Sequence, residues 1–493
     1  MKNLYTFILL LFTGFIFAQN SNIFWDRDFW NPSVTMKAVK EKIEAGNDPT
    51  ALNPNGFDAT VNAILGNASD DVIKYLLSLD GNGVNKKTHD GRTYLFWVAY
   101  RGNLPIMKYL IEKGAKTDLS DDKGYTLLLF AAIGGQTNTE LYDLLIKHGA
   151  SVNETNPKGT NALHNLAGQA KNLTELDFFT KQGLDLKSTD KAGHNVVDYA
   201  ARSGNKEIIG QLIKTGIPYK DINKDGSNAM LVASYGFRST NNLEFFKYLE
   251  SLGISANITD NKGVNAIHNL AYRNKDLAIF DYFIKKGIAI SKPDNDGNTP
   301  LINAANRNNA AVIKYFLDKK ADINAQNKEG KTALANAVHR NSPEVVELLI
   351  NNGADVNIID KNGNNLAYYL VDSYSKHNED DFNAKWELLT KKGLNLSHIQ
   401  SGGNNLYHLA ATKDSKKLLD KIANNKLNIN AKNDNGLTPL HKAAMTANTV
   451  DIIKYLTNLG ADPGILTDFD ETVYDLALEN ELLDKNKIEF LKI

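Results

Sequence analysis

The chain has 493 residues, too many for one compact core, so we expect several domains or one extended array. A formal net charge of −1 at pH 7 excludes a bulk basic field for nucleic acid or an anionic membrane. The complete lack of cysteine excludes disulfides, thiolate metal sites and cysteine nucleophiles, while a hydrophobic content of 42% allows a real core.

The first eighteen residues have the layout of a secretory signal peptide. Lys2 supplies a positive start, residues 4–17 are almost wholly apolar, and Ala18 precedes a polar stretch. Because the apolar run is shorter than the roughly 20 residues that span a bilayer, an uncleaved anchor is the less favoured alternative. We expect cleavage after Ala18, a periplasmic or secreted protein of bacterial type, and no membrane span after cleavage.

A repeat of 33 to 40 residues runs along the rest of the chain. Its mark is a short polar turn that ends in glycine, and these glycines are Gly56, Gly91, Gly124, Gly159, Gly193, Gly226, Gly263, Gly297, Gly330, Gly363, Gly403 and Gly436. Glu471 takes the glycine place in a last, degenerate unit. Each turn is followed by a small apolar helix, a polar break and a second helix, as in 438–444 and 450–459. The period predicts an all-α solenoid in which each unit buries its apolar side against its neighbours.

These units resemble the ankyrin repeat. The closest matches are NGLTPLH at 435–441, DGNTPL at 296–301 and NGADVN at 352–357, and the resemblance covers about residues 34–480. It implies an ankyrin-repeat solenoid of about twelve full repeats, with short β-turn fingers and a capping unit at each end.

The expected organisation is a signal peptide at 1–18, an N-terminal cap at 19–49, the repeat array at 50–467 and a C-terminal cap at 468–493. The N-terminal cap contains one helix at 36–45. Its aromatic residues Trp25, Phe29 and Trp30 are expected to cover the open end of the core, because terminal repeats need one covered and one polar face.

A longer period lies on top of the short one. Residues 159–167 closely match 263–271, at an offset of 104, and 403–410 resemble both. The unit before each of these is long, and its surplus residues fall at 135–139, 237–242 and 373–383. We expect three loops between paired helices that share one edge, since insertions in repeats map to one face.

No pattern in the sequence predicts a catalytic centre or a cofactor. Gly330-Lys331-Thr332 ends like a phosphate loop, but the first glycine of that motif is replaced by Ala325. Residues 221–226 match the first half of a calcium loop, with Val232 where a bidentate glutamate belongs, and the repeat turn explains them equally. In the ankyrin family the histidine equivalent to His164 hydrogen-bonds between neighbouring turns, so we expect no metal there.

The arginines are the most informative polar residues. The chain has eight, and five lie nine or ten residues after their turn glycine, at the end of the first helix, which lines the concave face in the ankyrin family. Arginine and tyrosine are both enriched at binding hot spots. The candidate partner-binding residues are Arg92, Tyr100, Arg101, Arg202, Tyr235, Tyr272, Arg273, Arg307, His339 and Arg340.

Two interpretations of these arginines remain open, because a cation also stabilises a helix C-terminus by about 0.3–1 kcal/mol. The preferred hypothesis is a monomeric, non-catalytic scaffold that binds a partly acidic protein or peptide on its concave face and turn tips, with no nucleic acid partner. The alternatives are an exported effector or immunity-type binder, a helper of a periplasmic enzyme, and a calcium-dependent module.

Overall fold

We analysed a computed structural model of the chain, in which residues 22–492 are described. The predicted signal peptide at 1–18 lies outside the described residues. The rest forms two compact units: the first holds Asn205–Tyr219 and the described residues up to Ala201, and the second holds Arg202–Gly204 and the residues from Lys220 onward.

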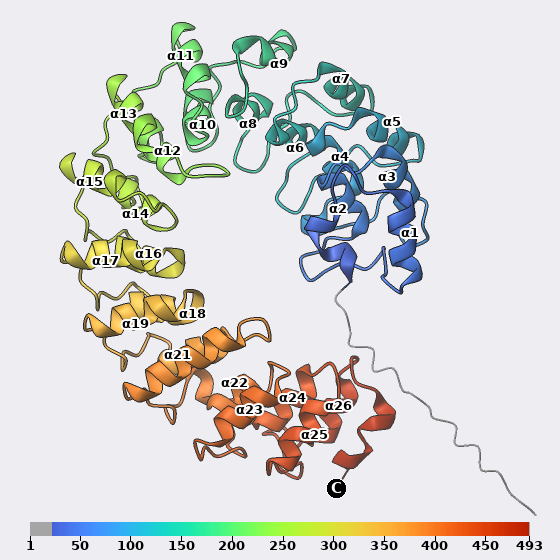
Figure 1. Ribbon diagram of the computed structural model, residues 1–493, viewed down its shortest axis with the longest axis vertical. Coiled ribbons are helices and arrows are strands. Elements are labelled where there is room, and N and C mark those ends of the chain that lie inside the picture. The colour runs from blue at the N-terminus through green and yellow to red at the C-terminus, as the bar shows by residue number, and fades with distance from the viewer. Residues whose placement is uncertain (1–21, 493) are drawn as a thin grey trace, which may run out of the picture. The chain divides into compact units, whose positions relative to one another are not determined.

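The first unit is built from helix pairs that follow the predicted repeat (Figure 1). It opens with η1 (Ile23–Trp25), η2 (Arg27–Phe29) and α1 (Met36–Glu44). The first helices of its pairs are α2 (Ala59–Leu65), α4 (Tyr94–Arg101), α6 (Leu127–Gly134), α8 (Ala162–Ala167) and α10 (Val196–Arg202), whose last residue belongs to the second unit. The second helices are α3 (Asp70–Leu77), α5 (Leu104–Glu112), α7 (Thr139–Lys147), α9 (Asp177–Lys181) and α11 (Lys206–Lys214), with η3 (His89–Gly91) and η4 (Leu173–Glu175) between them.

The second unit continues the same pattern (Figure 1). Its first helices are α12 (Ala229–Tyr235), α14 (Ala266–Ala271), α16 (Pro300–Arg307), α18 (Ala333–Arg340), α20 (Leu366–Asp372), α22 (Leu406–Ala410), α24 (Pro439–Thr446) and α26 (Val473–Glu479). Its second helices are α13 (Leu243–Ser251), α15 (Leu277–Lys285), α17 (Ala310–Asp318), α19 (Pro343–Asn351), α21 (Glu379–Lys391), α23 (Lys416–Ala423) and α25 (Asp451–Asn458), and η5 (Ser401–Gly403), η6 (Lys485–Lys487) and η7 (Glu489–Leu491) complete it. Within residues 22–492 extended pairing is limited to isolated bridges, so the all-α prediction is confirmed.

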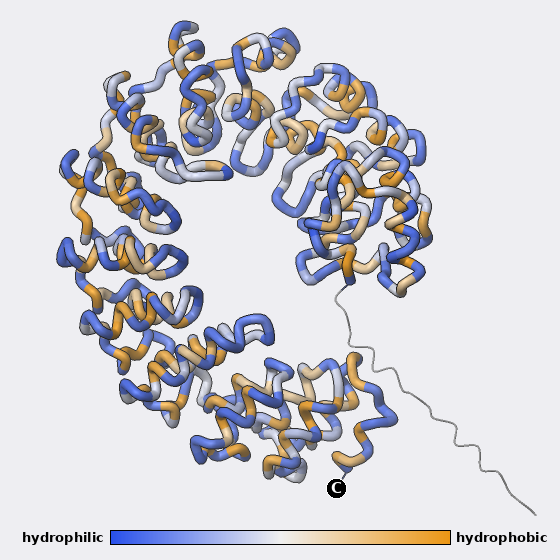
Figure 2. Tube along the Cα trace, viewed as in Figure 1, coloured by the Kyte–Doolittle hydropathy of each residue, from blue (hydrophilic) through white to orange (hydrophobic). Residues whose placement is uncertain are grey.

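Local sequence explains where each helix starts and what it buries. In α18 the Thr332 hydroxyl accepts a hydrogen bond from the Ala335 backbone N–H at 3.2 Å, which caps the helix start. In α17 the buried residues Val312, Ile313 and Phe316 form a stripe at helical spacing. Neighbouring first helices pack directly on one another, as α16 does on α18. Figure 2 shows the result, with apolar segments concentrated along the helices and polar ones at the turns.

The polar turns between repeats, which we call fingers, need glycine for two reasons. All twelve turn glycines have φ between +71° and +92°, a left-handed conformation that favours glycine. A Cβ on Gly330 would also lie 2.7 Å from the backbone nitrogen of Lys361 in the next finger. Neighbouring fingers approach this closely because their backbones are bonded, for example Lys361 N to Glu329 O at 2.9 Å.

The last finger corrects one prediction, because Glu471 does not occupy the glycine place. Thr467 N donates to Glu471 O at 2.9 Å, just as Asn433 N donates to Leu437 O in the preceding finger. Glu471 therefore corresponds to Leu437, and the place of Gly436 is taken by Asp470, whose φ is +60°. Aspartate tolerates this conformation better than most residues, and no described finger packs against it.

The third long loop is also shorter than predicted. Residues 135–138 and 237–242 of the first two surplus segments do separate paired helices, but of residues 373–383 only 373–378 form a loop, because α21 begins at Glu379. Three acidic residues, Glu379 to Asp381, occupy its first turn, where the helix dipole stabilises negative charge. Phe382 and Trp386 then bury this extended helix start.

The N-terminal aromatic residues form one cluster. Trp30 is buried, and its indole nitrogen donates to the carbonyl of Phe24 at 3.0 Å. The same carbonyl accepts from the Asn62 side chain of α2, also at 3.0 Å. Phe24, which the sequence analysis did not single out, is fully buried, whereas Trp25 and Phe29 are half-buried. This cluster joins the first described segment to the first repeat.

Candidate partner-binding surface

Arg92 is used inside the protein rather than presented on a surface. It follows the turn glycine directly and is buried, with its Nε 2.9 Å from Asp121 Oδ2 and a second ion pair to Asp90 at 3.1 Å. Its guanidinium also lies over the rings of Phe130 and Trp97. Because these partners occupy its guanidinium, Arg92 is not part of the candidate binding surface.

The two other candidates of the first unit end α4. Arg101 is exposed, and its Nε donates to Asn67 Oδ1 of the preceding repeat at 2.9 Å. Tyr100 is half-buried, with its ring centroid 5.2 Å from that of Phe130. Both residues therefore lie at the end of a first helix, as predicted, and both contact neighbouring side chains.

In the second unit, Arg273, Arg307 and Arg340 occupy the same place in three successive repeats. The first helices α14, α16 and α18 lie on the inner flank of this unit's curve, and α15, α17 and α19 lie on its outer flank (Figure 1). All three arginines are exposed: Arg307 and Arg340 are the last residues of their helices, and Arg273 lies two residues after α14. The structure thus brings three predicted residues onto one face.

These arginines have few partners within the protein. Arg273 donates one hydrogen bond, to the Tyr235 carbonyl at 2.8 Å. The Arg307 guanidinium lies 5.8 Å from the ring centroid of Tyr272 and makes no hydrogen bond or ion pair with a described residue. Arg340 likewise has no such bond within residues 22–492. A guanidinium carries five N–H donors, so most donors of this row are available to a ligand.

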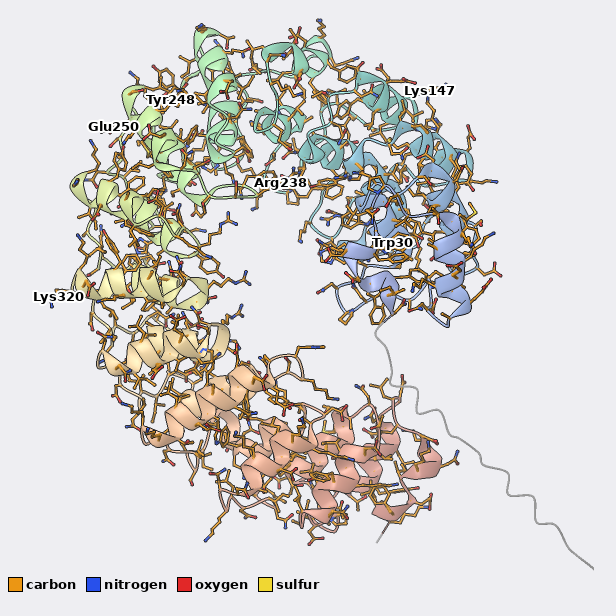
Figure 3. The ribbon with its side chains drawn as sticks, viewed as in Figure 1. Trp30, Lys147, Arg238, Tyr248, Glu250 and Lys320 are labelled. Atoms are coloured by element: carbon orange, nitrogen blue, oxygen red, sulfur yellow. The ribbon has the colours of Figure 1, made fainter. Side chains whose placement is uncertain are left out.

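Aromatic residues accompany the row. Tyr235 is 45% exposed at the end of α12, and Tyr272 is 36% exposed just after α14. The Tyr272 hydroxyl donates to Asn306 Oδ1 at 3.3 Å. Arg202 donates through Nε to the Gly236 carbonyl at 3.1 Å and lies near the ring of Phe237 in the α12–α13 loop, which also holds Arg238 (Figure 3).

His339 marks the other end of the row. Its Nε2 lies 3.1 Å from Asp372 Oδ2, and the Lys413 ammonium lies 3.3 Å from the other oxygen of that carboxylate. Burial lowers the pKa of His339. In the next repeat the place of His339 is taken by Asp372, whose carboxylate is already paired, and the place of Arg340 is taken by Ser373.

Sequence reasoning missed a row of asparagines beside the arginines. Asn269, Asn303 and Asn336 each lie six residues after a turn glycine and four residues before an arginine of the row. Residues four apart on a helix share a face, so Asn303 lies beside Arg307 and Asn336 beside Arg340. Arg273 lies in the turn two residues after α14, at the same place in the repeat. The count that located the arginines would have found these asparagines too.

The remaining motifs have structural roles. The Nε2 atoms of His164 and His408 each lie 3.0 Å from a carbonyl near the next finger, those of Ser188 and Leu437, so the predicted bond is present for these two histidines. Asp225 of the calcium-like turn accepts bonds from the Ser227 N–H and hydroxyl. Within residues 22–492 no group of three or more His, Asp or Glu residues could hold a metal ion, and no helix could cross a membrane.

Family comparisons agree with this architecture. A model described as "Ankyrin repeats (3 copies)" matches residues 34–121, 60–156, 97–174, 230–327, 265–360 and 304–380. A second, described as "Ankyrin repeats (many copies)", matches 407–457. Together these matches cover more than half of the chain.

Curated relatives match only part of this chain. A palmitoyltransferase, AKR1, of Lachancea kluyveri is 27% identical over 33% of this chain and 22% of its own length. Alpha-latrotoxin-Lg1a of Latrodectus geometricus is 34% identical over 25% of this chain and 9% of its own. The phosphocholine transferase AnkX of Legionella pneumophila is 27% identical over 36% and 18%, so the chain spans less than a quarter of each relative. The crystal structure of the human ASB11 ankyrin repeat domain aligns with 46% of this chain and 97% of that domain, at 20% identity and a TM-score of 0.39.

Proposed function

Because the chain belongs to the ankyrin-repeat family, we propose that it is a non-catalytic scaffold that binds a protein or peptide on the inner face of its second unit. Ankyrin repeats generally mediate protein–protein interaction and are typically non-catalytic. The catalytic activities named for the palmitoyltransferase and phosphocholine transferase relatives belong to proteins of which this chain matches only a small part.

One observation carries this proposal: three successive repeats place an exposed arginine at the same position with most of its donors unused. Arg273, Arg307 and Arg340 stand on packed helices, so their backbones are fixed before a partner arrives and little entropy is lost on binding. Arginine forms bidentate bonds to carboxylates, which favours a partly acidic partner. Tyr235 and Tyr272 add exposed aromatic surface beside them.

The place of action follows from the N-terminal sequence. We expect the protein to act in the periplasm or outside the cell after cleavage behind Ala18. Mass spectrometry of the protein isolated from separated cell fractions tests this, because the exported form would begin at Gln19. Intact residues 1–18 on protein from the cytoplasmic fraction would contradict export and leave the binding proposal standing.

The test of binding is crosslinking in the native cell, followed by affinity capture. The variant Arg273→Ala/Arg307→Ala/Arg340→Ala should retain its fold by circular dichroism and lose at least about tenfold in recovery of the specific partner. The matched control is Lys247→Ala/Lys285→Ala/Lys314→Ala, which removes the same charge from exposed positions on the outer helices α13, α15 and α17. That control should recover the partner normally.

Equal recovery with both triple variants would refute binding on this face. The identity of the partner separates the remaining alternatives, because an exported toxin would make the protein an immunity-type binder and a periplasmic enzyme would make it a helper.

A further inference from the structure

The inner face of the second unit has a geometry that restricts which partner segment it can bind. Six residues define this surface, which we call the Asn–Arg stripe: Asn269, Asn303, Asn336, Arg273, Arg307 and Arg340. An inference about its ligand rests on the proposed function, and it adds a conformation and a spacing that the proposed function does not need.

The asparagine row offers a line of hydrogen-bond acceptors. Asn303 Nδ2 donates to the His268 carbonyl at 3.2 Å, and Asn336 Nδ2 donates to the Ile302 carbonyl at 3.1 Å, in the same register one repeat later. Asn269 Nδ2 donates to the Ser234 hydroxyl at 2.8 Å. These bonds fix the amides through nitrogen, and the three Oδ1 atoms accept no hydrogen bond from a described residue.

The arginine row offers donors at the same intervals. Of the three arginines, only Arg273 donates a hydrogen bond to a described residue, through one nitrogen. The guanidinium of Arg307 lies over the ring of Tyr272. The asparagine, tyrosine and arginine places of the three repeats carry no carboxylate. Each repeat therefore presents one cationic fork beside one neutral acceptor.

Carboxylates in the neighbouring fingers form no ion pair with the three arginines within residues 22–492. Glu329 pairs with Lys331, and Asp294 Oδ1 accepts the backbone N–H groups of Asp296 and Asn298. Asp296 is exposed at its finger and has no ion pair among the described residues. The net character of the stripe is positive, which suits an acidic segment.

The repeat spacing then selects a conformation. Packed helices lie about 8–10 Å apart, so the stripe repeats at about that distance. A polyproline II helix has three residues per turn and rises about 3.1 Å per residue, so every third side chain lies on one side at intervals of about 9 Å. In a β-strand, residues two apart share a face at intervals of about 6.7 Å, and residues three apart point to opposite faces. A strand therefore does not match the spacing of the stripe.

The acceptor row decides against the remaining conformation. An α-helix places residues seven apart at about 10.5 Å on nearly one face, which also matches the spacing of the arginines. Its backbone N–H groups are bonded internally, however, and cannot reach the Asn Oδ1 atoms. A polyproline II backbone has no internal bonds and leaves its N–H groups available.

We infer that the Asn–Arg stripe binds a partner segment in the polyproline II conformation with an acidic residue at every third position. Each arginine binds one carboxylate of the segment, and each asparagine accepts one backbone N–H per turn. Three rungs accommodate three acidic residues, so a nine-residue segment fills the stripe.

Synthetic peptides test this ligand directly on the full chain. The probe is a fluorescein-labelled peptide of four Pro-Ala-Glu units, and fluorescence anisotropy measures its affinity. Its comparison peptide has the same composition with glutamates two and four residues apart, and a third carries N-methylated alanine and glutamate. We expect the regular peptide to bind at least about tenfold more tightly than either, because both comparisons lose rungs.

Variants of the protein connect the effect to the stripe. Arg307→Ala, which interrupts the row in its centre, should weaken the regular peptide at least about tenfold and reduce the preference between the first two peptides to about twofold. Arg307→Lys keeps the positive charge but loses the two-pronged guanidinium, so its affinity for the regular peptide should lie between those of the original protein and of Arg307→Ala. The outer variant Lys314→Ala is the control and should bind all three peptides as the original protein does.

Equal affinity for the regular and irregular peptides would overturn the inference, since it would show that binding depends on charge and not on the spacing of the glutamates. Tighter binding of a helical peptide with glutamates seven residues apart would overturn it as well. Either result leaves the proposed function intact if native capture still depends on the arginines, whereas capture that ignores them refutes the proposed function itself.

Discussion

The inner and outer faces of the second unit use the same repeat spacing in opposite ways. On the outer face, polar groups of successive helices satisfy one another: the Tyr315 hydroxyl donates to Asp281 Oδ1 at 2.7 Å, and Lys319 lies 3.2 Å from the same oxygen. Glu250, labelled in Figure 3, likewise accepts from the Tyr282 hydroxyl at 3.0 Å and pairs with Lys286. On the inner face, Arg307 and Arg340 have no hydrogen-bonded partner among the described residues.

This difference separates stability from binding. On the outer helices, polar groups that bond to one another join one repeat to the next and leave few donors or acceptors for a ligand. Exposed donors on the inner helices contribute little to folding and remain available. Substitutions on the two faces should therefore affect different measurements, and the comparison can be tested from the largest expected effect to the smallest.

The largest loss of stability is expected where the two helices of a repeat meet. Asn308 is buried, and its Nδ2 donates to the carbonyls of Ala271 and Asn274, both at 2.8 Å. Asn308→Ala leaves two buried acceptors unpaired and should lower the free energy of unfolding by about 3 kcal/mol. Urea unfolding followed by circular dichroism measures this. Asn351→Ala, at an exposed helix end, is the control, and equal values for the two variants would contradict the role of Asn308.

The next largest effect is expected in the pH dependence of the free energy of unfolding, through a buried histidine of the inner helix α22. Burial lowers the pKa of His408 to about 4, below the ordinary value near 6.5 that it regains on unfolding. The unfolded chain therefore binds the proton first, so the His408 contribution is fully present above pH 6.5 and is lost as the pH falls towards 4. This contribution to the free energy of unfolding should amount to about 2 kcal/mol, less than the whole difference between the folded and unfolded pKa values implies.

Urea unfolding at pH 7.0 and pH 4.5 checks this response. His408→Gln should reduce the difference between the two pH values by about 2 kcal/mol. His377→Gln changes an exposed histidine and should leave the difference as it is. The outer carboxylates Glu250 and Asp281 have pKa values lowered from 4.5 and 3.8, so the stability that they contribute is lost mainly as the pH falls below this window. An unchanged pH difference in His408→Gln would contradict the assignment.

A smaller effect is expected on the outer face. Tyr315→Phe removes the hydroxyl that binds Asp281 and should cost about 0.5–1 kcal/mol, because the site is partly exposed. Tyr368→Phe, on the inner helix α20, removes a hydroxyl with no hydrogen bond to a described residue and serves as the control. A larger cost for Tyr368→Phe would reverse the assignment of stabilising contacts to the outer face.

The smallest change in stability is expected for the residue with the largest effect on binding. Arg307→Ala removes an exposed side chain that, within residues 22–492, contacts the Tyr272 ring and makes no hydrogen bond or ion pair, so the free energy of unfolding should change by less than about 0.5 kcal/mol. The same urea experiment measures it. A loss above about 1 kcal/mol would show that the arginines are structural helix caps, the alternative that the sequence left open.

Most of the fold followed from the sequence because its signals are local. A turn glycine, a capping threonine and an apolar stripe act within a few residues, so the second helix predicted at 450–459 agrees with α25 to within one residue at each end. The arginines at the ends of first helices were located by the same counting. Their arrangement on one inner face of the second unit follows from packing of repeat on repeat.

What escaped the sequence depends on contacts between distant residues. Arg92 is buried because Asp121 of the next repeat binds it, 29 residues away, and no local pattern announces that pair. The Phe24 ring packs against those of Phe29 and Trp30, and its carbonyl accepts a bond from Asn62, 38 residues away. In the last finger, glycine spacing pointed to Glu471, and only the bond from Thr467 N to Glu471 O identifies Asp470 as the left-handed residue.

The side chain of Asp470 makes the last finger less suited to pack against a further finger than the glycine-containing fingers before it. Most internal fingers leave no room for a side chain at the turn glycine, as the 2.7 Å between a Cβ on Gly330 and the nitrogen of Lys361 shows, and Gly363, with nothing within 4 Å of its Cβ position, is an exception. A module appended behind Asp470 would meet a carboxylate at that point, whereas one copied between existing modules would find glycine on both sides. We therefore expect an added module to be accommodated more easily inside the array, where the matching segments 159–167 and 263–271 lie at an offset of 104, than behind Asp470.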